Sequence, residues 1–217
     1  MFLKNNLSIF ELCKHFPDFK FNHVAEVGIW KANECRSHDF ITSGVRTQLF
    51  EPHPVAFANL KSVYETHKNA EIHQVAISEV RGKAKFICNE SSSYLSTIDA
   101  PPCVQDDPHK VYRKNSKQEI EVDCEEFSSY DDGSIDLLLL DMEGAEWSVL
   151  STLKSRPRII AVETHSENRY SNPNIDKINR FMNDNTYKVL FRNTSDSFFI
   201  WGGDLGWGNG GNDNWKI

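Results

Sequence analysis

Apolar residues along the chain fall into short runs, and most of these runs are followed by a stretch with helical spacing. The apolar runs predict strands over residues 23–29, 46–51, 71–77, 135–141 and 158–164. Helical spacing predicts helices over residues 31–41, 54–64, 143–153 and 175–183. This alternation of strand and helix is typical of a parallel sheet covered by helices on both faces.

The remaining segments complete the expected architecture. Further strands are predicted over residues 83–88 and 119–124, and a leading helix over residues 7–16. The last two strands, over residues 187–191 and 197–201, follow the final helix directly, which predicts an antiparallel edge strand. We therefore expect an α/β fold with a doubly wound, mostly parallel sheet.

The chain is expected to form one domain over residues 1–217, with three less regular parts. Residues 1–20 form an N-terminal helical extension, and residues 202–217 form a tail rich in Gly, Asn and Trp. Residues 90–117 combine serines, prolines and charges, and an irregular segment of this length inside a domain is typical of a lid or acceptor loop.

Carboxylate residues follow three of the predicted strands. Glu26 lies in the first strand shortly before Gly28, and Glu51 ends the second strand. Asp141 and Glu143 come directly after four consecutive leucines, a run that predicts a strand buried on both faces. Because ligands bind at the carboxyl edge of open α/β sheets, this pattern predicts a small-molecule enzyme.

The first two of these sites indicate a cofactor that contains a nucleoside. Gly28 permits close approach of a ligand at the first strand–helix turn, and Glu51, 23 residues later, has the spacing of an acid that binds a ribose diol. The turn lacks the second and third glycines that bind a dinucleotide pyrophosphate, and Trp30 occupies this region. S-adenosylmethionine fits better, with Glu26 near its ammonium group; alternatively, Glu26 is a buried acid capped by amides of the turn.

Several motifs resemble the FkbM-type S-adenosylmethionine-dependent methyltransferases over roughly residues 20–200. The motifs are Ala25-Glu26-Val27-Gly28, Phe50-Glu51-Pro52-His53-Pro54, Val75-Ala76-Ile77-Ser78, Ser92-Ser93-Tyr94-Leu95, Asp141-Met142-Glu143-Gly144-Ala145-Glu146 and the strand over residues 159–165. Glu26 replaces the usual Asp of the first motif, and Ala32 stands where glycine is usual. The resemblance implies a seven-stranded, Rossmann-like class I methyltransferase fold.

The resemblance also implies the cofactor site and the substrate class. By resemblance, Glu51 holds the ribose, and Ala76 and Ile77 lie along the adenine. The full set of expected cofactor-binding residues is Glu26, Gly28, Glu51, Pro52, Ala76, Ile77, Ser93 and Asp141. The family mostly O-methylates sugars and related natural products, so the expected acceptor is a hydroxyl group of a sugar or glycan.

Methyl transfer to a hydroxyl group needs a residue that takes its proton. We expect Asp141 or His165 to be this general base, with Glu143 and Glu163 at the same two strand ends as further catalytic candidates. As an alternative, Asp141, Glu163 and His165 offer oxygen and imidazole ligands to a divalent cation such as Mg²⁺ or Mn²⁺.

Composition narrows the function further. The formal net charge is -7 and the 24 basic residues are scattered, which disfavours nucleic acid as a partner. The sequence has no apolar run of membrane-spanning length and no signal-peptide pattern, and its five cysteines are widely spaced, so we expect a cytoplasmic protein with reduced thiols and no membrane partner. The chain is also compatible with a domain of a larger glycan-building polypeptide.

Two alternative functions remain open from the sequence alone. A nicotinamide-dependent sugar-modifying enzyme uses the same type of sheet, although the missing glycines disfavour it. A domain that binds the cofactor without catalysis is the second alternative, because the first motif departs from the usual pattern at Glu26 and Ala32.

Overall fold

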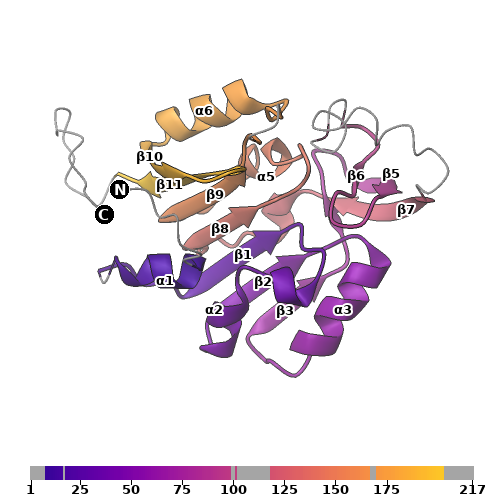
Figure 1. Cartoon of the computed structure of the whole chain (residues 1–217), viewed down its shortest axis with the longest axis horizontal. Coiled ribbons are helices and arrows are strands. Elements are labelled where there is room, and N and C mark those ends of the chain that lie inside the picture. Colours follow the sequence, from indigo (N-terminus) through magenta and orange to yellow (C-terminus); the bar gives the residue numbers. More distant parts are fainter. Residues whose placement is uncertain (1–7, 17, 99–100, 102–117, 167–169, 203–217) are drawn as a thin grey trace.

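A computed structural model of the chain describes residues 8–16, 18–98, 101, 118–166 and 170–202. Its main sheet has seven strands in the order β10-β11-β9-β8-β1-β2-β3 (Figure 1). Their bounds are β10 Tyr187–Arg192, β11 Asp196–Trp201, β9 Ile159–Glu163, β8 Leu137–Leu140, β1 His23–Val27, β2 Arg46–Phe50 and β3 Ala70–His73. The predicted seven-stranded, mostly parallel sheet is thus confirmed.

The antiparallel pairs lie at one side of the sheet, as expected. Strand β11 runs antiparallel to both of its neighbours, β9 and β10, whereas β9, β8, β1, β2 and β3 pair in parallel. The reversed strand is therefore the second from the edge, and β10 at the edge runs in the common direction.

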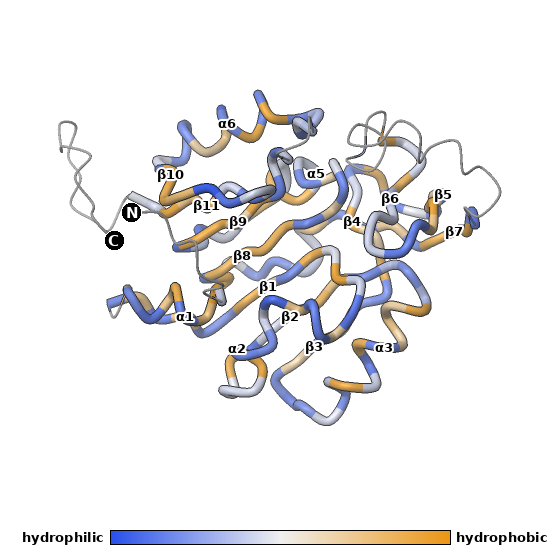
Figure 2. Tube along the Cα trace, in the orientation of Figure 1, coloured by the Kyte–Doolittle hydropathy of each residue, from blue (hydrophilic) through white to orange (hydrophobic). Residues whose placement is uncertain are grey.

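Helices cover both faces of the sheet. On one face lie α1 (Ile9–Lys14), α2 (His38–Thr42) and α3 (Pro54–Tyr64), and on the other lie η3 (Phe127–Ser129), α5 (Trp147–Leu150) and α6 (Ile175–Asp184). The four leucines of β8 explain this sandwich: Leu138 and Leu140 pack with the α5 and α6 core, whereas Leu137 and Leu139 pack with α1 and α2. The central strands are accordingly the most hydrophobic part of the trace (Figure 2).

A second sheet of four strands adjoins the first, in the order β4-β7-β5-β6. It consists of β4 (Ala76–Ile77), β7 (Gln118–Glu125), β5 (Gly82–Cys88) and β6 (Tyr94–Leu95). The predicted continuous strand over residues 71–77 was therefore wrong. The chain leaves the main sheet after His73, and Ala76 and Ile77 pair instead with Cys124 and Glu125.

Two predicted helices are shorter than expected. Residues 31–41 form a 3₁₀ turn, η1 (Ala32–Glu34), and then α2, because the N–H groups of Arg36 and Ser37 donate to the Glu26 carboxylate instead of to helical carbonyls. The helix predicted over residues 143–153 is α-helical only as α5, since Glu143 and Gly144 have φ values of 54° and 101°, which a right-handed helix cannot contain.

None of the described helices is long and apolar enough to cross a membrane. Four cysteines, Cys13, Cys35, Cys88 and Cys124, are free thiols, and Cys103 lies outside the described residues.

Candidate active site

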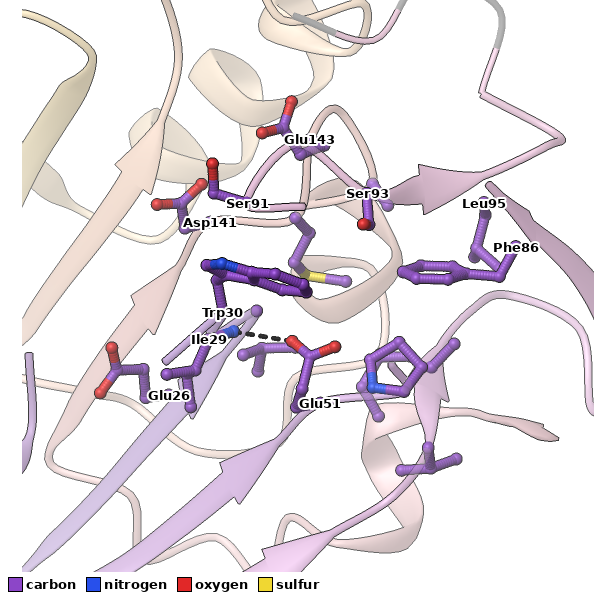
Figure 3. A pocket seen from close by; sticks show the side chains of 18 of the residues that line it. Glu26, Ile29, Trp30, Glu51, Phe86, Ser91, Ser93, Leu95, Asp141 and Glu143 are labelled. Atoms are coloured by element: carbon purple, nitrogen blue, oxygen red, sulfur yellow. Dashed lines mark hydrogen bonds between the residues drawn. The ribbon is translucent and has the colours of Figure 1, made fainter. Parts of the chain in front are cut away.

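A pocket opens at the carboxyl ends of β1, β2 and β8 and is closed on one side by the second sheet (Figure 3). The structure brings most of the predicted site residues together there. Glu26, Gly28, Glu51, Pro52, Ala76, Ile77, Ser93, Asp141 and Glu143 all line it. Glu163 and His165 do not.

Gly28 is required by the contact between β1 and β8. Its φ is 86°, and a Cβ atom at this position would lie 1.8 Å from the backbone oxygen of Asp141. The Gly28 N–H donates to the Phe50 carbonyl at 3.0 Å. A glycine here therefore lets the tips of three strands meet at the base of the pocket.

Glu51 is held in the wall of the pocket by backbone amides. Its two carboxylate oxygens accept hydrogen bonds from the N–H groups of Ile29 at 2.9 Å and His53 at 2.7 Å. The side chain is only 6% exposed, and burial raises the pKa of Glu51 to about 7, although the two amides lower it in part. The carboxylate is thus fixed in direction while it borders the pocket.

The wall next to Glu51 is apolar. It is formed by Pro52 and by four residues of the second sheet and the loop before it: Val75, Ala76, Ile77 and Phe86, with Leu95 beside them. In Figure 3 the Trp30 indole lies between Glu51 and Asp141, and its ring meets the His53 ring edge-on at a centroid distance of 5.0 Å. A flat, mostly apolar group of a ligand can pack against this wall.

Glu26 is buried at 1% exposure and is engaged by the segment that follows η1. It accepts hydrogen bonds from Arg36 N at 3.0 Å, Ser37 N at 2.8 Å and Ser37 Oγ at 2.6 Å, with Cys35 Sγ at 3.4 Å. These donors agree with the alternative in which Glu26 is capped by amides. Glu26 nevertheless borders the pocket, so a role toward a cofactor ammonium stays a prediction.

The sequence analysis missed Arg36, which also lines the pocket. Its Nη1 lies 3.4 Å from Asp196 Oδ1, and its Nε lies 3.7 Å from Glu26 Oε1. Burial lowers the pKa of Arg36, but Asp196, Asp141 and Glu26 outweigh this effect, so the pKa is raised. No local motif marks Arg36, because its acidic partners come from three separate strand ends.

Asp141 presents its side chain at the surface of the pocket. Surrounding protein atoms reduce its solvation, which raises its pKa; the Arg36 guanidinium acts in the opposite direction, and Asp196 and Glu26 raise the pKa further. A carboxylate with a raised pKa is a stronger base than an ordinary aspartate. Glu143, 8% exposed, lines the same part of the pocket.

The turn that carries Asp141 and Glu143 is fixed by a second missed residue, Glu146. It is fully buried, and its Oε1 accepts hydrogen bonds from Met142 N at 2.8 Å and Gly144 N at 3.3 Å. Its Oε2 accepts from Asn172 Nδ2 at 2.5 Å. Glu146 is part of the motif quoted above, but its structural role required Asn172, which is remote in the sequence.

Glu163 lies at the end of β9, next to the pocket but not in its wall. Burial, together with Asp141, Glu146, Glu143 and Asp196, raises the pKa of Glu163 to about 11. Its buried Oε2 has no hydrogen-bond partner among the described residues. The group therefore carries a proton at neutral pH, which does not suit a general base.

His165 is held outside the pocket. Its Nε2 lies 3.0 Å from the Asn193 carbonyl, which can only accept, so Nε2 carries the proton. Its Nδ1 lies 2.8 Å from the Thr164 hydroxyl. Since both ring nitrogens are engaged, the geometry favours Asp141 over His165 as the base.

The predicted metal site does not form. Among the described residues, no group of three or more His, Cys, Asp or Glu side chains is arranged to hold a metal ion. Asp141 lines the pocket, Glu163 is a half-buried acid outside its wall and His165 is hydrogen-bonded to Asn193, so the three expected ligands do not converge.

Most of the expected acceptor loop and of the expected tail cannot be placed relative to the pocket. Residues 102–117 of the expected lid and residues 203–217 of the tail lie outside the described residues. The described start of the lid places Ser91 and Ser93 at the pocket, and Ser93 Oγ accepts from Asn89 N at 2.8 Å.

A family model described as the methyltransferase FkbM domain matches residues 22–189. No match was found among curated proteins.

Similar solved structures are found at low sequence identity. WbdD in complex with the kinase inhibitor LY294002 is 11% identical, with a TM-score of 0.50, over 93% of this chain and 41% of that one. A S-adenosylmethionine-dependent methyltransferase from Methanosarcina mazei is 8% identical, with a TM-score of 0.46, over 89% of this chain and 97% of that one. The chain thus spans about 40% of the length of WbdD.

Proposed function

Because the chain belongs to the FkbM methyltransferase family, we propose that it transfers a methyl group from S-adenosylmethionine to a hydroxyl group of a sugar or glycan. Family membership favours methyl transfer over the nicotinamide-dependent alternative. The observation that carries the cofactor assignment is Glu51, a buried carboxylate fixed by two backbone amides at the edge of the pocket.

The residues of the pocket suit each part of this cofactor. The Glu51 carboxylate has the chemistry to accept hydrogen bonds from ribose hydroxyls. Ala76, Ile77 and Phe86 form the apolar wall for the adenine. Gly28, which lacks a side chain, lets the Asp141 backbone pack against β1 and so brings Asp141 to the base of the pocket. When bound, S-adenosylmethionine supplies a methyl group activated by a positively charged sulfur.

Asp141 is the proposed general base. Its carboxylate is exposed to the pocket and would accept the proton of the acceptor hydroxyl at one of its oxygens. Glu146 supports this role because it binds the N–H groups of the turn and so fixes the backbone that carries Asp141. Holding base and acceptor together removes most of the entropic cost of the encounter.

A sugar acceptor is supported by the resemblance and by the surroundings of Asp141. Trp30 offers an aromatic face, and Ser91 and Glu143 offer polar groups at the same part of the pocket. Such a mixture suits a sugar ring, which has apolar faces and hydroxyl edges. A cytoplasmic location and membership of a larger glycan-building polypeptide stay predictions.

Calorimetric titration tests the cofactor assignment. The chain should bind S-adenosylhomocysteine with micromolar affinity, and NAD should not bind. Glu51→Gln should weaken this binding roughly tenfold or more, since hydrogen bonds to a charged group contribute about 1.5–3 kcal/mol. Glu79→Gln, at an exposed position, is the matched control and should bind as the wild type does. Binding of NAD alone would overturn the proposal.

A further inference from the structure

The lining of the pocket changes in chemistry from one end to the other. Figure 3 shows Glu26 at one end, Phe86 and Leu95 at the other, and Glu51 between them. The charged end contains Glu26 and Asp141, together with Arg36, whose Nε lies 3.7 Å from Glu26 Oε1. If Glu51 holds the ribose, the adenine belongs at the apolar end, and the amino-acid portion of the cofactor belongs at the charged end.

Arg36 is fixed in this charged end by its backbone. Its N–H donates to Glu26 at 3.0 Å, and the next residue, Ser37, bonds to the same carboxylate through its N–H and its hydroxyl. The guanidinium group reaches from Glu26 on β1 to Asp196 on β11. Since β8 and β9 lie between these strands, it spans the sheet edge at which Asp141 follows β8.

The protein leaves the hydrogen-bonding capacity of this guanidinium largely unused. It has five N–H donors, and charge-assisted bonds of such donors are usually about 2.7–2.9 Å long. The contact of Nη1 with Asp196 measures 3.4 Å, and that of Nε with Glu26 measures 3.7 Å. The buried Nη2 has no partner among the described residues. Buried donors of this kind normally have a hydrogen-bond acceptor, so we expect a ligand to accept hydrogen bonds from this guanidinium.

The charges around Arg36 indicate which ligand. Among the described residues that line the pocket, Arg36 is the one basic side chain, and it interacts electrostatically with two acids of the same lining, Glu26 and Asp141. A phosphate group would be repelled by these acids. An α-amino acid matches them, because its carboxylate needs a guanidinium and its ammonium needs a carboxylate within the same few ångströms.

We propose that Arg36 binds the α-carboxylate of the amino-acid portion of S-adenosylmethionine and is a specificity-determining residue for this cofactor. The inference rests on the proposed function. It assigns a cofactor-binding role to Arg36, which lies just after Ala32, where the chain departs from the usual pattern of the first motif.

The test compares two ligands that differ only in the carboxylate. S-adenosylhomocysteine carries it, and its decarboxylated analogue, S-adenosyl-3-thiopropylamine, does not. The wild type should prefer the first by about 10- to 100-fold, the effect of charged hydrogen bonds. In Arg36→Met this preference should fall to within about threefold, and Arg36→Lys, which keeps the charge, should give an intermediate preference.

Each outcome decides the matter. Equal binding of the two ligands by the wild type, or an undiminished preference in both Arg36→Met and Arg36→Lys, would overturn the assignment of Arg36 while the cofactor site stands. Absence of S-adenosylhomocysteine binding by the wild type would instead overturn the proposed function itself. Glu51→Gln is the internal control, because it should weaken both ligands by the same factor and leave the preference intact.

Discussion

The tip of β2 and the tips of β8 and β9 all carry acidic residues, but these residues have opposite surroundings. At the tip of β2, both oxygens of Glu51 are satisfied by backbone amides from nearby residues. At the tips of β8 and β9, Asp141 and Glu163 crowd together with further acids, and Glu163 keeps a buried oxygen without a partner among the described residues. Satisfied groups suit binding, and crowded groups with raised pKa values suit proton transfer.

Asp141→Asn tests this division most strongly. If the β8 tip supplies only chemistry, the substitution should lower the turnover number by about 10²- to 10⁴-fold, the usual contribution of a general base. The affinity for S-adenosylhomocysteine should stay within severalfold of the wild type. Transfer of labelled methyl groups to an acceptor that the wild type methylates gives the first quantity, and calorimetry gives the second. Near-normal turnover would remove Asp141 from the mechanism.

Gly28→Ala tests whether the close contact between Gly28 and the Asp141 backbone, which connects the two regions, stabilises the fold. The added Cβ would collide with the Asp141 backbone oxygen, so we expect a loss of at least about 3 kcal/mol in the free energy of unfolding by urea. Gly133→Ala is a matched control, since Gly133 has nearly the same φ, 88°, with no atom near the added Cβ. It should cost only the conformational strain, about 1–2 kcal/mol. Equal losses in the two variants would contradict a contact-specific effect.

The two regions also differ in how much of them the sequence predicts. Gly28 and Glu51 could be identified from spacing, because each is placed by its own strand and the sheet order brings strand ends together. The surroundings of Asp141 could not. Arg36 contacts Glu26 and Asp196, and Asn172 donates to Glu146, which fixes the turn that carries Asp141. Neither residue lies in a motif, and these contacts exist only once the ends of β1, β8, β9 and β11 have been brought together.

The errors in predicted elements have the same origin. The helix expected after β1 is interrupted because Glu26 competes for the amides of Arg36 and Ser37, a tertiary contact that overrides local propensity. The strand expected over residues 71–77 divides because β7, more than forty residues later, pairs with Ala76 and Ile77. The periodicity of apolar residues indicates which face of an element is buried. It does not indicate which other segment of the chain packs against that face.

The pH dependence of cofactor binding sharpens the description of the β2 tip. With the pKa of Glu51 near 7, the carboxyl is mostly protonated at pH 6 and mostly ionised at pH 8. An ionised carboxylate is the better acceptor for ribose hydroxyls, so affinity for S-adenosylhomocysteine should rise roughly fivefold to tenfold over this interval. Titrations of Glu51→Gln should show no such rise. A rise of equal size in the variant would assign the titration to another group.

Glu163→Gln probes the crowded region through stability. Because the folded state raises the pKa of Glu163 from 4.5 to about 11, it holds a proton that the unfolded chain releases above pH 4.5. The free energy of unfolding of the wild type should therefore fall with rising pH relative to Glu163→Gln, by up to about 1 kcal/mol per pH unit. Urea denaturation at pH 5, 7 and 9 measures this slope, with Glu79→Gln as the control that should follow the wild type. Parallel curves for wild type and Glu163→Gln would mean that the β9 tip is not crowded as described.

The smallest effect is expected at His165, which the sequence placed beside Asp141 as a candidate base. Its ring is committed to the Asn193 carbonyl and the Thr164 hydroxyl, so it supports the loop after β9 and does not face the pocket. His165→Asn should lower the free energy of unfolding by about 1–2 kcal/mol, as expected for two lost hydrogen bonds, and should change turnover by less than about threefold. A loss of turnover as large as that of Asp141→Asn, with cofactor affinity retained, would reverse the assignment. The loop would then have to reorganise on acceptor binding, because the ring is hydrogen-bonded to Thr164 and Asn193 and lies outside the wall of the pocket.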